Sequence, residues 1–226
     1  MARLGQEVGP DASAGQMPRL RSLCDLDAEG QTRRGGEMIT GSDFHRIIAC
    51  LGEQGQEDIT WSEACCAPTD ADDFASEAIF VICNSGMKNT IAVKIFAKVM
   101  AAIQGGVSTF DVFRHPGKAK AIDDIWRRRD ELMAGYLAAV DKVSFCETLP
   151  WIGGITKYHL AKNFGADVAK PDVHLQRLAD REGVTPQQLC ERLARDSGYK
   201  IATVDVLLWR ACADGILNSR TGAISA

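Results

Sequence analysis

Apolar residues recur along most of this chain at intervals of three and four positions, the spacing that collects them on one face of a helix. The segment 73–84 carries large apolar residues in every turn, as expected of a helix that is buried on most sides. The segment 90–104 is amphipathic, with Lys94 and Lys98 on its polar side. No segment shows the sustained alternation of apolar and polar residues that is typical of strands. The pattern therefore predicts an all-α fold.

Glycine, proline and small polar residues divide this pattern into separate helices. Ser42 or Asp43 is expected to cap the first helix, and Thr185-Pro186 to open a later one with proline at its first position. The predicted helical segments are 44–51, 61–65, 73–84, 90–104, 118–139, 157–164, 185–194 and 201–213, with a further helix beginning at Pro171-Asp172.

The N-terminal part lacks helical periodicity. Residues 1–38 are rich in Gly, Ala, Ser, Asp and Arg, so we expect a flexible leader followed by a helical domain over residues 39–226. That length suits one large domain or two small lobes. Two groups of arginines are either solvated or in contact with DNA phosphates. They are Arg19, Arg21, Arg33 and Arg34 in the leader, and the triplet Arg127-Arg128-Arg129.

Composition narrows the class of protein. With 46% hydrophobic and 25% charged residues, no apolar run of membrane-spanning length and no signal-peptide-like region, the chain is expected to be cytoplasmic and without a membrane partner. The net charge of −4 means that DNA binding would need a local basic face. The eight cysteines include no Cys-x-x-Cys pair, which favours reduced, mostly buried thiols over a metal site or disulfides.

The stretch 149–179 carries the most specific chemistry. The Gly153-Gly154 turn exposes backbone groups to which a phosphate or a cation could come close, and Thr156 is expected to cap the helix 157–164. Asp172 opens the next helix, where the helix dipole favours an ionised carboxylate. Alone, Asp172 would be taken for an ordinary N-cap. About twenty residues after a phosphate cradle, it suits a protein that holds a nucleic-acid backbone and acts on a sugar.

These residues resemble the helix-hairpin-helix DNA glycosylase superfamily, whose signature is an L-P-G-hydrophobic-G hairpin followed by a proline-proximal aspartate. The resemblance is specific over about thirty residues and weaker over the helices from about Phe74 onward. It implies a two-lobed helical fold with the hairpin motif at 144–165 and the catalytic aspartate loop at 166–175. The matching residues are Leu149, Pro150, Ile152, Gly153 and Thr156 in the hairpin, then Asp172, His174, Leu175, Arg177, Leu178 and Ala179.

The resemblance also implies roles for individual residues. Asp172 would stabilise the positive charge that builds on deoxyribose as the base leaves, after the nucleotide has been extruded from the duplex. The expected DNA-binding residues are Trp151, Ile152, Gly153, Gly154, Thr156 and Lys157 in the hairpin, and Asn84, Ser85 and Met87 at a corner that would enter the duplex. The candidate base-stacking residues are Trp61, Trp126 and Tyr136. The corner could equally be an ordinary helix end.

Three departures from the family pattern refine this expectation. Ile155 occupies the position where bifunctional members carry a Schiff-base lysine, which predicts a monofunctional enzyme; rescue by Lys157 is the alternative. Trp151 replaces a usual glycine, and either packs on neighbouring helices or contacts DNA. The clustered cysteines of the iron–sulfur branch are missing, so no such cluster is predicted. A monovalent cation at the hairpin is the one cofactor considered.

The sequence thus predicts a monomeric, monofunctional DNA glycosylase that acts on double-stranded DNA containing a damaged or modified base. Its role would be base-excision repair, or defence against phage DNA with modified cytosine such as glucosylated hydroxymethylcytosine. The alternative is a non-catalytic helix-hairpin-helix module that only binds DNA.

Overall fold

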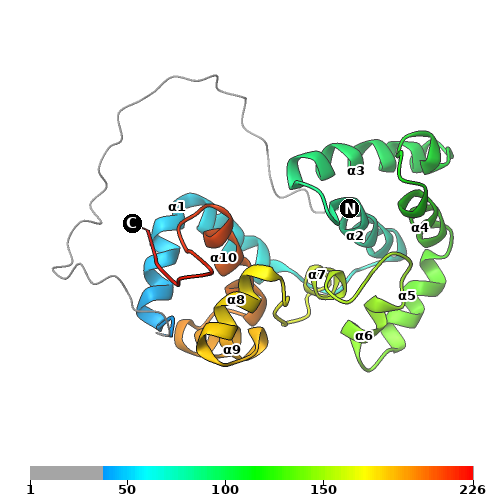
Figure 1. Cartoon of the computed structure of the whole chain (residues 1–226). Helices are drawn as coiled ribbons and strands as arrows, with labels where there is room; N and C mark the ends of the chain where they lie inside the picture. Colours follow the sequence, from blue (N-terminus) through cyan, green and yellow to red (C-terminus); the bar gives the residue numbers. More distant parts are fainter. Residues whose placement is uncertain (1–37, 226) are drawn as a thin grey trace, which may run out of the picture.

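The computed structural model describes residues 38–225, and within this range the chain is all-α, as the apolar spacing predicted (Figure 1). No β-strand forms in these residues, where Leu217 and Ile224 make only an isolated antiparallel bridge. The helices are α1 (Gly41–Ala64), α2 (Ala71–Asn84), α3 (Asn89–Gln104), the 3-10 helix η1 (Thr109–Asp111), α4 (Pro116–Arg127), α5 (Arg129–Ala138), α6 (Lys142–Glu147), α7 (Thr156–Asn163), α8 (Val173–Glu182), α9 (Pro186–Ser197) and α10 (Ile201–Ala213). The predicted leader, residues 1–38, lies outside the described residues except for Met38.

Two apolar clusters organise the helices. One is built by α2 to α7, the continuous middle of the chain, around Phe74, Ile122 and Leu160. The other joins α1 to α8, α9 and α10, so the first and last helices share the core that contains Phe44 and Leu208. Figure 1 shows these groups side by side, with α7 between them. Each helix buries its apolar face within its own group, which is the main contribution to its stability.

The first helix differs from the prediction. Its N-cap is Thr40, whose hydroxyl accepts a hydrogen bond from the amide of Asp43, while the Asp43 carboxylate accepts one from the Thr40 amide. This capping box starts the helix before the expected Ser42 or Asp43 cap. The helix then kinks at Gly52, where φ is 56°, and continues to Ala64. The predicted segment 61–65 is therefore only the end of a longer helix.

The predicted helix 118–139 is two helices, because Arg128 leaves helical geometry with φ −103° and ψ 12°. The arginine triplet lies at this break and is engaged by carboxylates. Arg127 and Arg128 both contact Asp124, Arg128 also contacts Glu131 at 2.8 Å, and Arg129 contacts Asp72. Its charges are thus neutralised within the protein, which favours the solvated-face interpretation of the triplet.

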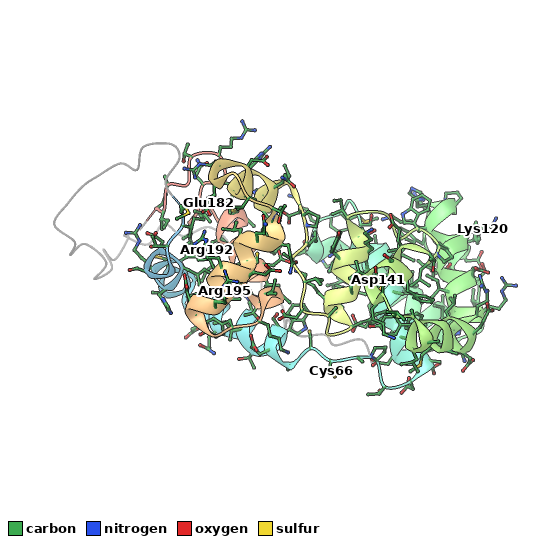
Figure 2. All side chains as sticks on the ribbon, turned by 90° about the horizontal axis from the view of Figure 1, so that it is seen from below. Cys66, Lys120, Asp141, Glu182, Arg192 and Arg195 are labelled. Atoms are coloured by element: carbon green, nitrogen blue, oxygen red, sulfur yellow. The ribbon has the colours of Figure 1, made fainter. Side chains whose placement is uncertain are left out.

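The two helix groups are joined by close contacts as well as by the chain. The Lys162 ammonium on α7 bonds the Asp205 carboxylate on α10, and both side chains are buried. Gly165 has φ +80°, and a Cβ atom there would lie 2.7 Å from the backbone of Cys66, on the segment that links α1 to α2 (Figure 2). Glycine is therefore required where these two segments cross.

None of the helices within residues 38–225 has the length and apolar character needed to cross a bilayer. Three of the cysteines in this range are buried thiols: Cys83, Cys146 and Cys190. Burial raises the pKa of the Cys83 and Cys146 thiols to about 12, which makes both unreactive at neutral pH.

Candidate nucleic-acid interface and catalytic carboxylate

The predicted hairpin is a turn between α6 and α7. Leu149 and Ile152 anchor this turn in the first core, whereas Gly153 and Gly154 are exposed. Trp151 has φ +66° and is the one non-glycine residue of the described chain with positive φ. A left-handed conformation is costly for a residue with a Cβ atom. The strain explains physically why glycine suits this position.

The start of α7 presents free backbone donors to solvent. No backbone or side-chain acceptor within residues 38–225 pairs with the amides of Gly154, Ile155 and Thr156. The Thr156 hydroxyl instead accepts a hydrogen bond from the Gly153 amide at 2.7 Å, so it fixes the turn and does not cap the helix. The N-cap is Ile155, without a side-chain bond, and the expectation of a Thr156 cap was wrong. Three unpaired amides at a helix N-terminus suit an anion such as phosphate.

The Trp151 ring lies against the start of α4. It packs edge-on against the His115 ring with centroids 5.0 Å apart. A Cβ atom on Gly117 would fall 2.5 Å from the ring, so only glycine admits it. Even so, 45% of Trp151 is exposed. The ring thus packs against α4 and is also partly open to solvent. This geometry is compatible both with packing on a neighbouring helix and with a DNA contact.

The corner after α2 lies beside the same part of α4. The Ser85 carbonyl accepts a hydrogen bond from the Lys118 ammonium at 2.6 Å, and Lys118 is buried. Burial lowers the pKa of Lys118. Gly86 takes φ +71°, which turns the chain toward Met87, a residue partly packed on the first core. Through the start of α4, the structure brings the corner and the hairpin turn to neighbouring positions.

Lys157 is engaged by an acid. Its ammonium contacts the Glu147 carboxylate at 2.5 Å, across the hairpin from α7 to α6. The hydrogen bond from Lys157 to Glu147 raises the pKa of Lys157, which favours the protonated form. A protonated, ion-paired lysine is a poor nucleophile, and its charge is only partly free to attract phosphate.

Asp172 is the N-cap of α8, and its side chain is 12% exposed. Oδ1 accepts hydrogen bonds from the amides of His174 at 2.9 Å and Leu175 at 3.1 Å. Oδ2 has the Lys170 ammonium 3.9 Å away. One oxygen therefore holds the helix while the other faces a neighbouring charge. The helix cap therefore leaves Oδ2 outside the hydrogen bonds that begin α8.

A buried charge cluster supports the loop that leads to Asp172. Asp205 accepts hydrogen bonds from the Lys170 amide, at 3.1 Å, and from the Lys162 ammonium. Burial lowers the pKa of Lys170, an effect that Asp172 opposes and Lys162 adds to. Burial, together with the ammonium groups of Lys170 and Lys162, lowers the pKa of His159 to about 3, so its ring is neutral at physiological pH.

The three candidate base-stacking residues lie on three different helices, α1, α4 and α5. Tyr136 is buried in the first core, 4.9 Å from the Phe164 ring centroid, and burial raises its pKa to about 12. Trp126 packs on the same core with the Arg129 guanidinium 4.5 Å over its ring, and Trp61 lies on α1. Their assignment to a base pocket stays a prediction.

No cluster of three or more His, Cys, Asp or Glu side chains that could hold a metal ion occurs in residues 38–225. Comparison with protein-family models, with curated proteins and with solved structures found no match. The resemblance to the helix-hairpin-helix glycosylases therefore rests on the sequence motif alone.

Sequence reasoning missed two groups of residues near Asp172. Lys170 was overlooked although it immediately precedes Pro171-Asp172. Ser219 and Arg220 lie in a C-terminal turn that has no helical periodicity, yet Ser219 Oγ is 3.2 Å from the His174 ring. The proximity of Lys170 could have been inferred from its sequence position, whereas that of Ser219 depends on tertiary packing.

Proposed function

We propose that the protein is a monofunctional DNA glycosylase that extrudes a damaged or modified base and hydrolyses its N-glycosidic bond. One observation carries the proposal: Asp172 caps the helix through Oδ1, while Oδ2 accepts no hydrogen bond within residues 38–225 and lies 3.9 Å from the Lys170 ammonium.

The residues around Asp172 fit the steps of this reaction. The free amides of Gly154, Ile155 and Thr156 would hold a backbone phosphate without reading sequence. The corner at Asn84, Ser85 and Met87 would then fill the gap that the extruded nucleotide leaves. Its position beside the hairpin turn, through their shared contacts with the start of α4, supports this pairing.

The hydrolysis step itself requires only the Asp172 carboxylate and a water molecule. As the C1′–N bond breaks, the base takes the bonding electron pair, and positive charge on the sugar is stabilised by the Asp172 carboxylate. Water then adds its oxygen to C1′ and loses a proton to Asp172 or to solvent. The product is an abasic site in an intact strand.

The monofunctional assignment follows from the amines near the hairpin. Ile155 has none, and Lys157 is paired with Glu147. Lys170 lies beside Asp172, and because burial lowers its pKa, it is the amine to exclude experimentally. Borohydride trapping on the parent and on Lys170→Met should give no DNA adduct with either protein. An adduct that disappears in Lys170→Met would make the enzyme a lyase.

The substrate is proposed only by class, as a damaged or modified base in double-stranded DNA. Base-excision repair and defence against phage DNA with glucosylated hydroxymethylcytosine are the two settings. Abasic-site formation would be measured on alkylated and deaminated duplexes and on natural phage DNAs with modified cytosine. Breaks that require alkali, on one substrate only, would establish the reaction and identify the base. DNA binding with no breaks on any substrate would favour the non-catalytic binding module.

A further inference from the structure

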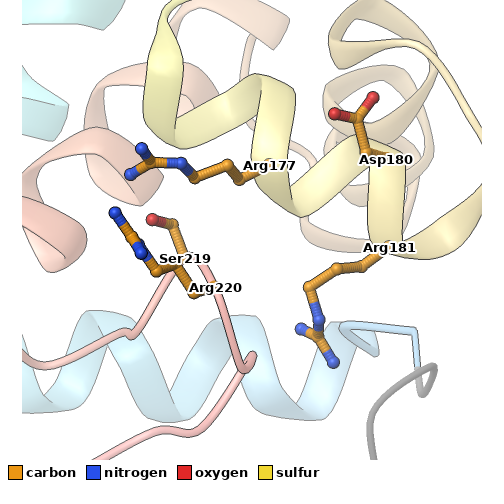
Figure 3. A pocket seen from close by; sticks show the side chains of 5 residues that line it. All are labelled: Arg177, Asp180, Arg181, Ser219 and Arg220. Atoms are coloured by element: carbon orange, nitrogen blue, oxygen red, sulfur yellow. The ribbon is translucent and has the colours of Figure 1, made fainter.

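A hollow of about 400 Å³ opens between the second half of α8 and the C-terminal turn (Figure 3). An adjoining hollow of about 290 Å³ shares part of this lining and extends to His174. We call the two together the arginine hollow. The residues that line its larger part are Arg177, Asp180, Arg181, Ser219 and Arg220.

The hollow gathers positive charge without a matching acid. Within residues 38–225, no ion pair or side-chain hydrogen bond engages the guanidinium groups of Arg177, Arg181 and Arg220. The one carboxylate in the lining, Asp180, accepts a hydrogen bond from Gln176 at 2.7 Å and points away from the Arg177 guanidinium in Figure 3. Like charges held together are unfavourable unless an anion compensates them.

Two other arginines of the same helix group are paired with carboxylates. Arg192 bonds Glu182, and Arg210 bonds Asp58 at 2.8 Å. These two guanidinium groups are neutralised by carboxylates, whereas within residues 38–225 those of Arg177 and Arg220 are not.

One guanidinium of the lining packs closely against the C-terminal segment. Arg181 lies so close to Gly222 that any Cβ atom on that glycine would overlap the Arg181 side chain, and Gly222 has φ +72°. The Nη2 atom of Arg181 is buried and has no hydrogen-bond partner in the described part of the chain. A buried donor without an acceptor is costly, and this guanidinium nitrogen is unsatisfied in the described part of the chain.

We propose that the arginine hollow binds a backbone phosphate of the DNA strand that carries the extruded nucleotide. The proposal rests on the proposed function, because the hollow extends to His174, two residues after Asp172. His174 donates its backbone amide to Asp172, and its ring contacts Ser219 in the lining. Arg177 lies five residues beyond Asp172 on the same helix, a rise of about 7.5 Å.

The chemistry of the lining fits a phosphodiester. Arginine binds phosphate oxygens through two parallel N–H donors, and Arg177 and Arg220 come from segments that are distant in sequence. Arg220 is exposed, so a long polymer can reach it from outside. A second phosphate contact near Asp172, in addition to the hairpin amides, would fix the sugar against the carboxylate.

The test measures DNA affinity against salt concentration for Arg177→Gln, Arg220→Gln, the double variant and the parent. The probe is a duplex with a tetrahydrofuran abasic-site analogue, followed by fluorescence anisotropy. Removal of one arginine–phosphate interaction should lower the slope of log affinity against log salt by about 0.9 and weaken affinity about 10-fold. Arg195→Gln is the matched control, an exposed arginine on α9 outside the hollow, and should keep the parental slope.

The variants are expected to fold, because Arg177 and Arg220 have no side-chain partners within residues 38–225 to lose; thermal unfolding checks this. The proposal would be overturned if all hollow variants kept the parental slope of log affinity against log salt. It would also be overturned if inorganic phosphate raised the thermal stability of the parent but not of Arg177→Gln, while the slopes for DNA stayed unchanged. Asp172→Asn separates the two claims. If the arginine variants show lower slopes and the parent excises no base, the hollow binds DNA phosphate but the protein is not a glycosylase. If Asp172→Asn loses excision and the arginine variants keep the parental slope, the protein is a glycosylase but the hollow is not a phosphate site.

Discussion

Removing one partner of the buried pair between Lys162 and Asp205 should strongly destabilise the protein. The two side chains are 9% and 2% exposed, and Asp205 also accepts a hydrogen bond from the Lys170 amide. Asp205→Asn would leave the Lys162 ammonium buried without a counterion, at a cost of about 3–5 kcal/mol. A domain of this size is stable by only about 5–15 kcal/mol, so the loss is a large fraction of the total.

A double-mutant cycle isolates the pair from its surroundings. Lys162→Met alone should cost a similar amount, because Asp205 then lacks its cation. Asp205→Asn combined with Lys162→Met removes both charges of the pair, while the introduced amide oxygen can still accept a hydrogen bond from the Lys170 amide. The double variant should therefore be less destabilised than the sum of the singles by about 2–4 kcal/mol.

Urea unfolding followed by circular dichroism measures all four free energies of unfolding. Because α7 and α10 belong to different cores, hydrogen exchange should also show loosened protection where the two groups meet. Single variants that lose less than about 1 kcal/mol each and add without coupling would refute the reasoning.

Three further perturbations test the site. The pKa of His159 is about 3 in the folded protein and about 6.5 in the unfolded chain, so the free energy of unfolding should fall by at most about 2 kcal/mol as pH drops from 7 to 5. His159→Gln should remove this part of the pH dependence. Urea titrations that show the same pH dependence in the variant and the parent would contradict this. Trp151→Gly should lower stability by about 1 kcal/mol in the same assay, since about 2–3 kcal/mol of lost ring burial exceeds the relief of left-handed strain; a stabilised variant would show that the ring is not held against α4. Glu147→Gln should free Lys157 and steepen the salt dependence of DNA binding by about 0.9 in the log–log slope, whereas weaker binding would oppose the hairpin as a phosphate site.

Local features of this chain were predictable. The segment 73–84, the helix 201–213 and the helix start at Asp172 agree with the structure to within two residues, because apolar spacing and capping depend on near neighbours. The break at Arg128 was not predictable, since arginine is a good helix former and the surrounding apolar pattern continues across it.

Contacts between distant segments account for most of what the sequence did not reveal. The Lys118 bond to the corner spans 33 residues, and the pairing of Lys162 with Asp205 spans 43. Arg177 and Arg220 meet only because the C-terminal turn folds back on α8. Lysine, aspartate and arginine at these positions are ordinary surface residue types, so nothing in the sequence marks them as neighbours.

The central claim is that the Asp172 carboxylate performs the chemistry, and single-turnover excision rates on the best substrate test it most directly. Asn is also a good N-cap, so Asp172→Asn keeps the start of α8 while removing the charge. Asp196→Asn, the same change at an exposed position of α9 outside the hollow, is the control. The account predicts at least about a 100-fold lower rate for Asp172→Asn with undiminished DNA affinity, and a parental rate for Asp196→Asn. A parental excision rate in Asp172→Asn would contradict it.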